Sequence, residues 1–398
     1  MSMEALQTED ISESRSLKEQ GADWAKRAYE NLEKLEIPAK IKEEIRQSLE
    51  TPQLGPYHNE GVEMASHVGR ISEVVDQINE GSFKFDEIGL PSDLENDAKN
   101  MIERAIKANY SNMQLYALLH DIAKQRCMNI EDSEKKQRVF TLDEWKTLVA
   151  ENGGDKDKAQ TALVEQGYKK IGYRIGKELA ATSGGQEKDH GDEAGVMIQE
   201  LGERDPETKD FAEKNLPLII KAIQNHELHF QVFNDAKTAN RYEKSLKEKF
   251  SQEEIDFIYA VCFIDISGSL NKEGKADYSG FKNMVNAKKL YEIIADCGVQ
   301  NTDALKNLGT ENEVLTKITQ LKKDEALKKL ILGTDDLAAM EGLFDSWGIK
   351  SEDDKKLMSE IISKNLGQEN PIAVINQSMP NNLKRYTKNL KQYLEVKV

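Results

Sequence analysis

The sequence predicts an all-α protein. Residues that favour helices, such as Lys, Glu, Leu and Ala, are abundant, whereas only 8 prolines occur in 398 residues. Apolar residues recur at three- and four-residue spacings, and no segment shows the strict alternation typical of a half-buried strand. A chain of this length can bury a substantial core, so we expect one large domain or two smaller ones.

The first part of the chain is predicted to be a polar leader followed by two helices. Residues 1–14 are polar and acidic, and a helix is expected from Ser16 to about Leu35. A second helix is expected over residues 40–49. Two prolines and a glycine predict a loop over residues 51–59.

The middle of the chain is predicted to be a helical domain. Ser111 is expected to cap one of its helices, and a capping box of Ser251 and Glu254 starts another. The apolar spacing predicts helices over residues 64–78, 94–106, 111–120, 190–201, 217–229, 251–268 and 281–294.

A polar segment over about 128–188 interrupts this domain. We expect short helices at 142–150 and 157–179 within it, and a flexible end at Ser183-Gly184-Gly185. Long polar insertions often act as lids or bind substrate, although a plain spacer is the simpler alternative.

Three domains follow from these patterns: an N-terminal leader and helical extension (1–54), a large helical domain (55–298) and a C-terminal helical region (299–398). The C-terminal region is predicted to pack on the large domain or to bind a protein partner. Its expected helices cover residues 303–308, 312–322, 324–332, 336–346, 352–364 and 380–394.

Histidines and buried aspartates carry the chemical signal. All 6 histidines lie between His58 and His229. His67 falls on the apolar stripe of its helix, and His120-Asp121 ends another apolar helix. Asp265 is a lone charge in the most hydrophobic helix of the chain, where a carboxylate without a cation or donors would destabilise the fold.

The order of these residues resembles the HD-domain superfamily of metal-dependent phosphohydrolases. The segment LLHDIAK (118–124) is close to the form usual in that family, and the resemblance covers about residues 55–270. It implies an HD-domain helical bundle that binds one or two divalent ions of Mn, Fe, Ni, Co, Mg or Zn. The implied metal ligands are His67, His120, Asp121, His190, His226 and Asp265.

Three further residues are candidates for catalysis. Lys124 resembles the Lys that follows His-Asp by three in many HD hydrolases, and could pair with a phosphate oxygen. His58 lies in a Tyr-His-Asn sequence that resembles cyclic-nucleotide phosphodiesterases, in which this His protonates the leaving oxygen. The position of that family's metal-binding His is Val62 here. Arg70 could bind a substrate phosphate or be a surface charge.

The expected function is therefore phosphoester hydrolysis of a small, nucleotide-like substrate. The chain lacks the Gly-Tyr-Pro of the cyclic-di-GMP branch, although His226-Glu227 is similar to its His-Glu. Two alternatives remain open. One is an HD-fold di-iron oxygenase similar to myo-inositol oxygenase, and the other is a non-catalytic protein that a metal stabilises.

Composition restricts the partners. A net charge of -16 argues against broad binding to nucleic acid or to anionic membranes. Three widely spaced cysteines fit a reducing compartment. No secretory signal or membrane span is visible, so we expect a cytoplasmic protein, with export lacking an N-terminal signal left open.

Overall fold

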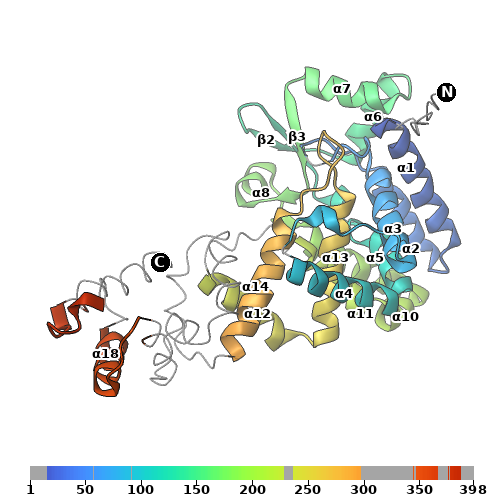
Figure 1. The fold of residues 1–398 in the computed structure, drawn as a ribbon. Coiled ribbons are helices and arrows are strands. Elements are labelled where there is room, and N and C mark those ends of the chain that lie inside the picture. The colour runs from blue at the N-terminus through green and yellow to red at the C-terminus, as the bar shows by residue number, and fades with distance from the viewer. Residues whose placement is uncertain are drawn as a thin grey trace, which may run out of the picture. The chain divides into compact units, whose positions relative to one another are not determined.

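A computed structural model shows a predominantly helical chain with two small sheets among its described residues (Figure 1). The all-α prediction is confirmed. The structure describes residues 16–56, 58–90, 92–227, 236–296, 344, 347–365, 375 and 377–386. The chain forms two compact units, residues 1–228 with 256–278 and residues 229–255 with 279–398. These limits differ from the predicted boundaries at 54 and 298.

The N-terminal helices of the first unit pack on the helix that carries His67. A capping box of Ser16 and Glu19 starts α1 (Leu17–Lys34), and α2 (Ala39–Leu49) follows. Trp24, Ala28 and Leu32 form the buried face of α1, which packs on α3 (Met64–Glu80).

Gly69 allows α1 and α3 to approach closely. A Cβ atom at this position would lie 1.8 Å from the backbone oxygen of Trp24. A glycine is therefore required where the two helix backbones meet.

Further helices complete the first unit. Ser111 lies inside α5 and does not cap it, because the helix begins one residue earlier, after Asn109. The predicted helix over 217–229 is shorter than expected and ends at Ile223, so that His226 lies in the turn that follows. The helices are α4 (Ser92–Ala108), α5 (Tyr110–Leu119), α9 (His190–Arg204), α10 (Pro206–Asn215), α11 (Pro217–Ile223) and α13 (Gln252–Gly268). Short 3-10 helices occur at η1 (Asp86–Ile88) and η2 (Lys124–Arg126).

The polar insertion contains strands, which the sequence did not lead us to expect. β1 (Asn129–Asp132) pairs antiparallel with β2 (Gln137–Val139) and with β3 (Tyr168–Gly172), in the order β2-β1-β3. The predicted helix over 157–179 is thus wrong over residues 166–176. The remaining elements are α6 (Leu142–Glu151), α7 (Lys156–Glu165), β4 (Arg174–Ile175), α8 (Lys177–Ser183) and β5 (Lys188–Asp189), and β4 pairs with β5.

A small core of its own stabilises the insertion. Ile130 and Ile171 from the sheet pack with Phe140 and Trp145. Leu54 and Val62, from the loop before α3, pack against the same core. The insertion therefore supports the loop that carries His58.

The described part of the second unit is also helical. In it α12 (Ala236–Lys249) packs against α14 (Ser279–Asp296), and the predicted helix over 352–364 is present as α18 (Glu352–Asn365). Residues 380–386 form a turn and η5 (Lys384–Tyr386) in place of the predicted α-helix. The other predicted C-terminal helices lie outside the described residues, apart from Phe344.

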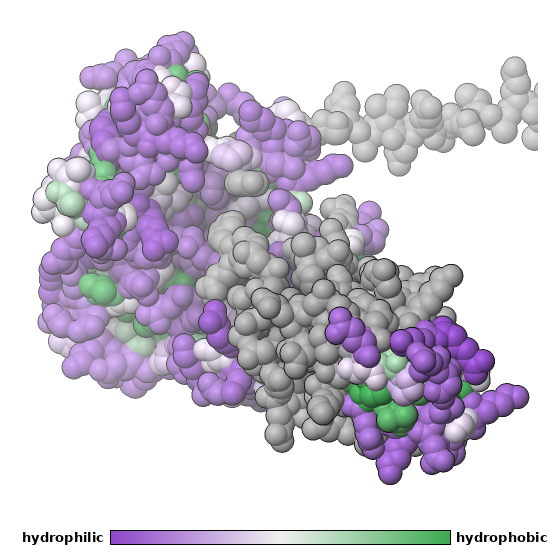
Figure 2. Space-filling model, turned by 90° about the vertical axis from the view of Figure 1, so that its left-hand side faces the viewer, coloured by the Kyte–Doolittle hydropathy of each residue, from purple (hydrophilic) through white to green (hydrophobic). Residues whose placement is uncertain are grey.

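Hydrophobic residues occur only in scattered places on the face shown in Figure 2. The large hydrophobic side chains that are exposed among the described residues are Tyr110, Val164, Val196 and Leu357. Within the described ranges, no helix has the length and apolar character that crossing a membrane requires.

Candidate metal centre

The six residues expected to bind metal converge in the interior of the first unit. They come from α3, the end of α5, the start of α9, the turn after α11, and α13. All six are buried, from His67 and His120 at 0% exposure to Asp265 at 9%. The structure therefore brings together side chains that are as much as 198 positions apart in the chain.

Four of these residues form a first group of ligand atoms. The Nε2 atoms of His67 and His120 lie 3.3 Å apart. Oδ1 of Asp265 lies 3.1 Å from Nε2 of His67 and 3.7 Å from Nε2 of His120. Oδ2 of Asp121 lies 2.9 Å from Nε2 of His120, so two imidazoles and two carboxylates face a common point.

A second group shares Asp121 with the first. The Nε2 atoms of His190 and His226 lie 3.2 Å apart, and Oδ1 of Asp121 lies 3.7 Å from Nε2 of His190. Each oxygen of this carboxylate thus faces a different pair of histidines. Asp121, His190 and His226 place one ligand atom each within 4.8 Å of the others, as do His67, His120 and Asp121.

Backbone carbonyl groups fix the protonation of two of the rings. Nδ1 of His120 lies 2.9 Å from the carbonyl oxygen of Ala117, and Nδ1 of His226 lies 2.5 Å from that of Ile223. A carbonyl oxygen only accepts hydrogen bonds, so each Nδ1 carries a proton, and Nε2 is the nitrogen of each ring that is left to bind a metal. Metal-bound histidines are held by the same kind of outer hydrogen bond.

Asp121 carries a buried negative charge that hydrogen bonds do not satisfy. Neither of its oxygens has a hydrogen bond of acceptable geometry, although Nζ of Lys124 lies 2.9 Å from Oδ2. Burial raises its pKa, but His120 and Lys124 outweigh this and hold the pKa well below its usual range. A buried carboxylate in this state requires a nearby cation.

The other groups have charge states that suit a metal site. Burial opposes ionisation of Asp265, yet the hydrogen bond with His67 lowers its pKa below the usual range. Burial lowers the pKa of His190 and of His226, and so favours the neutral rings that bind metals.

His67 differs, because it touches two carboxylates. Burial lowers the pKa of its ring, but the hydrogen bond with Asp265 and the nearby Glu60 carboxylate outweigh this effect and raise it to about 10. Ring nitrogens and carboxylates converge here, and imidazole and carboxylate ligands suit Mn²⁺, Fe²⁺, Co²⁺, Ni²⁺ or Zn²⁺. These buried residues could thus bind a divalent metal ion.

Lys124 lies beside the centre and is 7% exposed. Its Nζ is paired with Asp121 and lies 4.6 Å from the centre of the Tyr173 ring, which the insertion provides. Its role in binding phosphate stays a prediction.

Arg70 makes packing contacts. Its Nε donates to the carbonyl oxygen of Ser267 at 2.9 Å, and its guanidinium group lies 4.9 Å from the centre of the Trp24 ring. These contacts link α3 to α1 and to the end of α13. Binding of a substrate phosphate by Arg70 stays a prediction.

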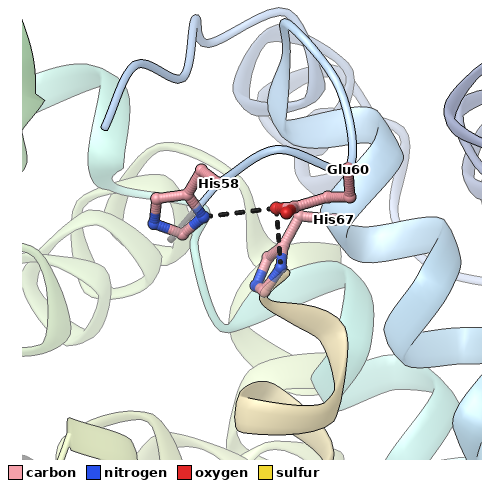
Figure 3. Close-up of side chains that lie close together, drawn as sticks. All are labelled: His58, Glu60 and His67. Atoms are coloured by element: carbon pink, nitrogen blue, oxygen red, sulfur yellow. Dashed lines mark hydrogen bonds and ion pairs between the residues drawn. The ribbon is translucent and has the colours of Figure 1, made fainter. Parts of the chain in front are cut away.

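A buried carboxylate that we did not expect lies between His58 and His67. Figure 3 shows Glu60 between the two imidazoles, with Oε1 3.2 Å from Nδ1 of His58 and 3.3 Å from Nδ1 of His67. Glu60 is 0% exposed. It occupies a loop, where periodicity does not distinguish buried from exposed positions, and its place two residues after His58 was the only sequence signal.

Comparisons with known proteins identify no relative. No protein-family model matches the chain, and neither curated proteins nor solved structures show significant similarity to it. The resemblance to the HD superfamily thus depends on the motif residues quoted above.

Proposed function

We propose that this chain is an HD-type, divalent-metal-dependent phosphohydrolase or phosphodiesterase that acts on a small, nucleotide-like phosphoester. The convergence of two histidine pairs on the Asp121 carboxylate supports this proposal. The Nε2 atoms lie 3.3 Å apart in one pair and 3.2 Å apart in the other, and Nε2 is the nitrogen that His120 and His226 turn towards the centre.

The ligands divide between two positions. His67, His120, Asp121 and Asp265 would hold one ion, and Asp121 with His190 and His226 would hold a second. When bound, such ions activate water and neutralise negative charge on a phosphate. Asp121 would serve both positions because its two oxygens face different histidine pairs.

Two further side chains would act on the substrate. Lys124 offers a cation beside the centre, where it can stabilise a non-bridging phosphate oxygen. His58 is the proton donor in this proposal. Its Nδ1 faces Glu60, so Nε2 is the atom that would protonate the leaving oxygen, and the buried anion of Glu60 stabilises the charged ring.

The test is metal analysis followed by an activity screen. The purified chain is stripped with a chelator, reloaded with Mn²⁺, Ni²⁺ or Fe²⁺, and assayed with phosphomonoesters and phosphodiesters. We expect bound metal and metal-dependent release of phosphate or of the leaving alcohol. Asp121→Asn should remove both.

A matched control is Asp256→Asn, which changes a carboxylate on α13 that pairs with Arg104 outside the centre. This variant should keep metal and activity. Full turnover by a metal-free Asp121→Asn protein would contradict the proposal.

The same experiment distinguishes the alternatives. Iron retained through purification, with a spectrum that changes on exposure to oxygen and no phosphoester turnover, would indicate an oxygenase. Metal-dependent melting without turnover of any phosphoester would indicate a binding protein.

A further inference from the structure

We propose that Glu60 is a positioning residue whose carboxylate determines which ring nitrogen His67 turns towards the metal centre, and which holds His58 beside it. Any contribution of Glu60 to catalysis rests on the function proposed above. Its structural content, the proton position on His67, can be measured without any substrate.

One oxygen of Glu60 faces both rings. Oε1 lies 3.2 Å from Nδ1 of His58, within hydrogen-bond geometry, and 3.3 Å from Nδ1 of His67, where the contact is an ion pair without hydrogen-bond alignment (Figure 3). An ionised carboxylate only accepts hydrogen bonds, so Glu60 favours a proton on the ring nitrogen that faces it. The other nitrogen of His67, Nε2, is then the atom left to bind metal.

That nitrogen already faces the centre. Nε2 of His67 lies 3.3 Å from Nε2 of His120 and 3.1 Å from Oδ1 of Asp265. If the proton were on Nε2 and the lone pair on Nδ1, the ring would direct its lone pair at Glu60 and lose its place as a ligand. Glu60 disfavours that arrangement by repulsion between the two acceptors.

Local backbone structure explains why a side chain is needed. His120 and His226 follow helices, and each donates from Nδ1 to the carbonyl oxygen three residues earlier. His67 lies within α3, where the helix uses its carbonyl groups for its own hydrogen bonds. Glu60 replaces the carbonyl group that the helix cannot offer.

Glu60 is itself held rigidly. Its Oε2 accepts a hydrogen bond of 3.1 Å from the backbone nitrogen of Leu270. Its backbone oxygen packs against Gly21 of α1, where a Cβ atom would lie 2.2 Å away.

Gln53 also contacts the His58 ring. Its Nε2 lies 3.1 Å from Nδ1 of His58, while its Oε1 is buried without a hydrogen-bond partner. Rotation of the amide by half a turn exchanges these atoms. In the rotated form Gln53 accepts the same proton as Glu60, which suits a protonated Nδ1.

The first test measures the ring protons of the unmodified chain. Two-bond ¹H–¹⁵N spectra of the ¹⁵N-labelled protein are recorded without metal and with Zn²⁺ added, and His58→Asn separates the signals of the two rings. We expect His67 to be protonated at Nδ1 in both states and to coordinate zinc through Nε2. A proton-free Nδ1 in His67, or zinc bound at Nδ1, would overturn the proposal.

The second test is Glu60→Gln, with Glu63→Gln as the matched control. Glu63 is also a buried carboxylate near the start of α3, but it contacts Trp145 and Lys156 of the insertion. Calorimetric titration with Zn²⁺ should show about 10- to 100-fold weaker binding for Glu60→Gln, as is typical when an outer partner of a ligand is lost. Glu63→Gln should bind zinc as the unmodified chain does.

The two proposals fail in different ways. If the unmodified chain binds no divalent metal, the proposed function fails, while the Nδ1 proton of His67 still decides the role of Glu60. If Zn²⁺ binds equally well to Glu60→Gln and to the unmodified chain, the role of Glu60 is refuted and the metal centre stands. A Glu60→Gln protein that does not fold leaves the decision to the spectra of the unmodified chain.

Discussion

Replacing Gly69 with alanine should destabilise the protein, although alanine favours helices. The new Cβ atom would lie 1.8 Å from the Trp24 oxygen and 2.5 Å from the Trp24 carbonyl carbon. Real Cβ contacts essentially never fall below 3.0 Å, so α1 must move by about 1.2 Å relative to α3. The obstructing atoms belong to a helix backbone, which cannot rotate away as a side chain can.

The magnitude follows from two opposing effects. Alanine gains about 0.5–1 kcal/mol over glycine within a helix. Overpacking costs about 1–3 kcal/mol, and the upper end is expected here because backbone atoms are displaced. We therefore expect a net loss of about 2 kcal/mol, which corresponds to a fall of roughly 4–8 °C in Tm for a unit of this size.

Gly195→Ala on α9 is the matched control. Its Cβ atom would find Nε2 of Gln224 at 3.5 Å and Cγ2 of Ile220 at 3.7 Å, which are ordinary contacts. This variant should therefore be about 0.5–1 kcal/mol more stable than the unmodified chain. Thermal and urea unfolding measure both effects. A Gly69→Ala protein as stable as the Gly195→Ala protein would refute the close approach of α1 and α3.

Three further predictions concern other parts of the first unit. Saturating the centre with a divalent ion at 100 times its Kd should stabilise the chain by about 2.7 kcal/mol, and an unchanged Tm after chelation would contradict the site. Burial raises the pKa of the Cys127 thiol to about 12, so peptide mapping should show alkylation of Cys127 only after unfolding, and reaction in the native protein at pH 8 would be inconsistent with its burial. Burial also raises the pKa of the Glu63 carboxyl above its value of about 4.5 in the unfolded chain. The contribution of Glu63 to the free energy of unfolding is therefore fully present below pH 4.5 and is lost as the pH rises through the higher pKa of the folded chain. Unfolding free energies measured against pH should show this loss, and Glu63→Gln should remove it.

Helical periodicity predicted the residues that form the centre. The apolar stripe of α3 placed His67 inside, and the isolated charge of Asp265 in α13 indicated a buried partner. Both inferences depend on one helix face being buried, and both residues are indeed buried. Sequence spacing could not show that the two oxygens of Asp121 face different histidine pairs, because that depends on how separate helices pack.

The features that were missed have local causes. The strands of the insertion are two to five residues long, and in β1 only the first two positions are fully buried. Alternation cannot be recognised over so few residues. Ser111 is a good capping residue, but the helix begins at Tyr110, one position before it.

The way the insertion is tied to the loop before α3 limits how far this domain can be reduced in size. The backbone nitrogen of Ile171 donates to the carbonyl oxygen of Leu54, and the Tyr173 hydroxyl donates to that of Pro52. Gln160 donates to the carbonyl oxygen of Gln53. A shortened version with residues 128–188 replaced by a linker would lose the scaffold on which the His58–Glu60 segment is built, so a minimal version of the first unit must keep these residues.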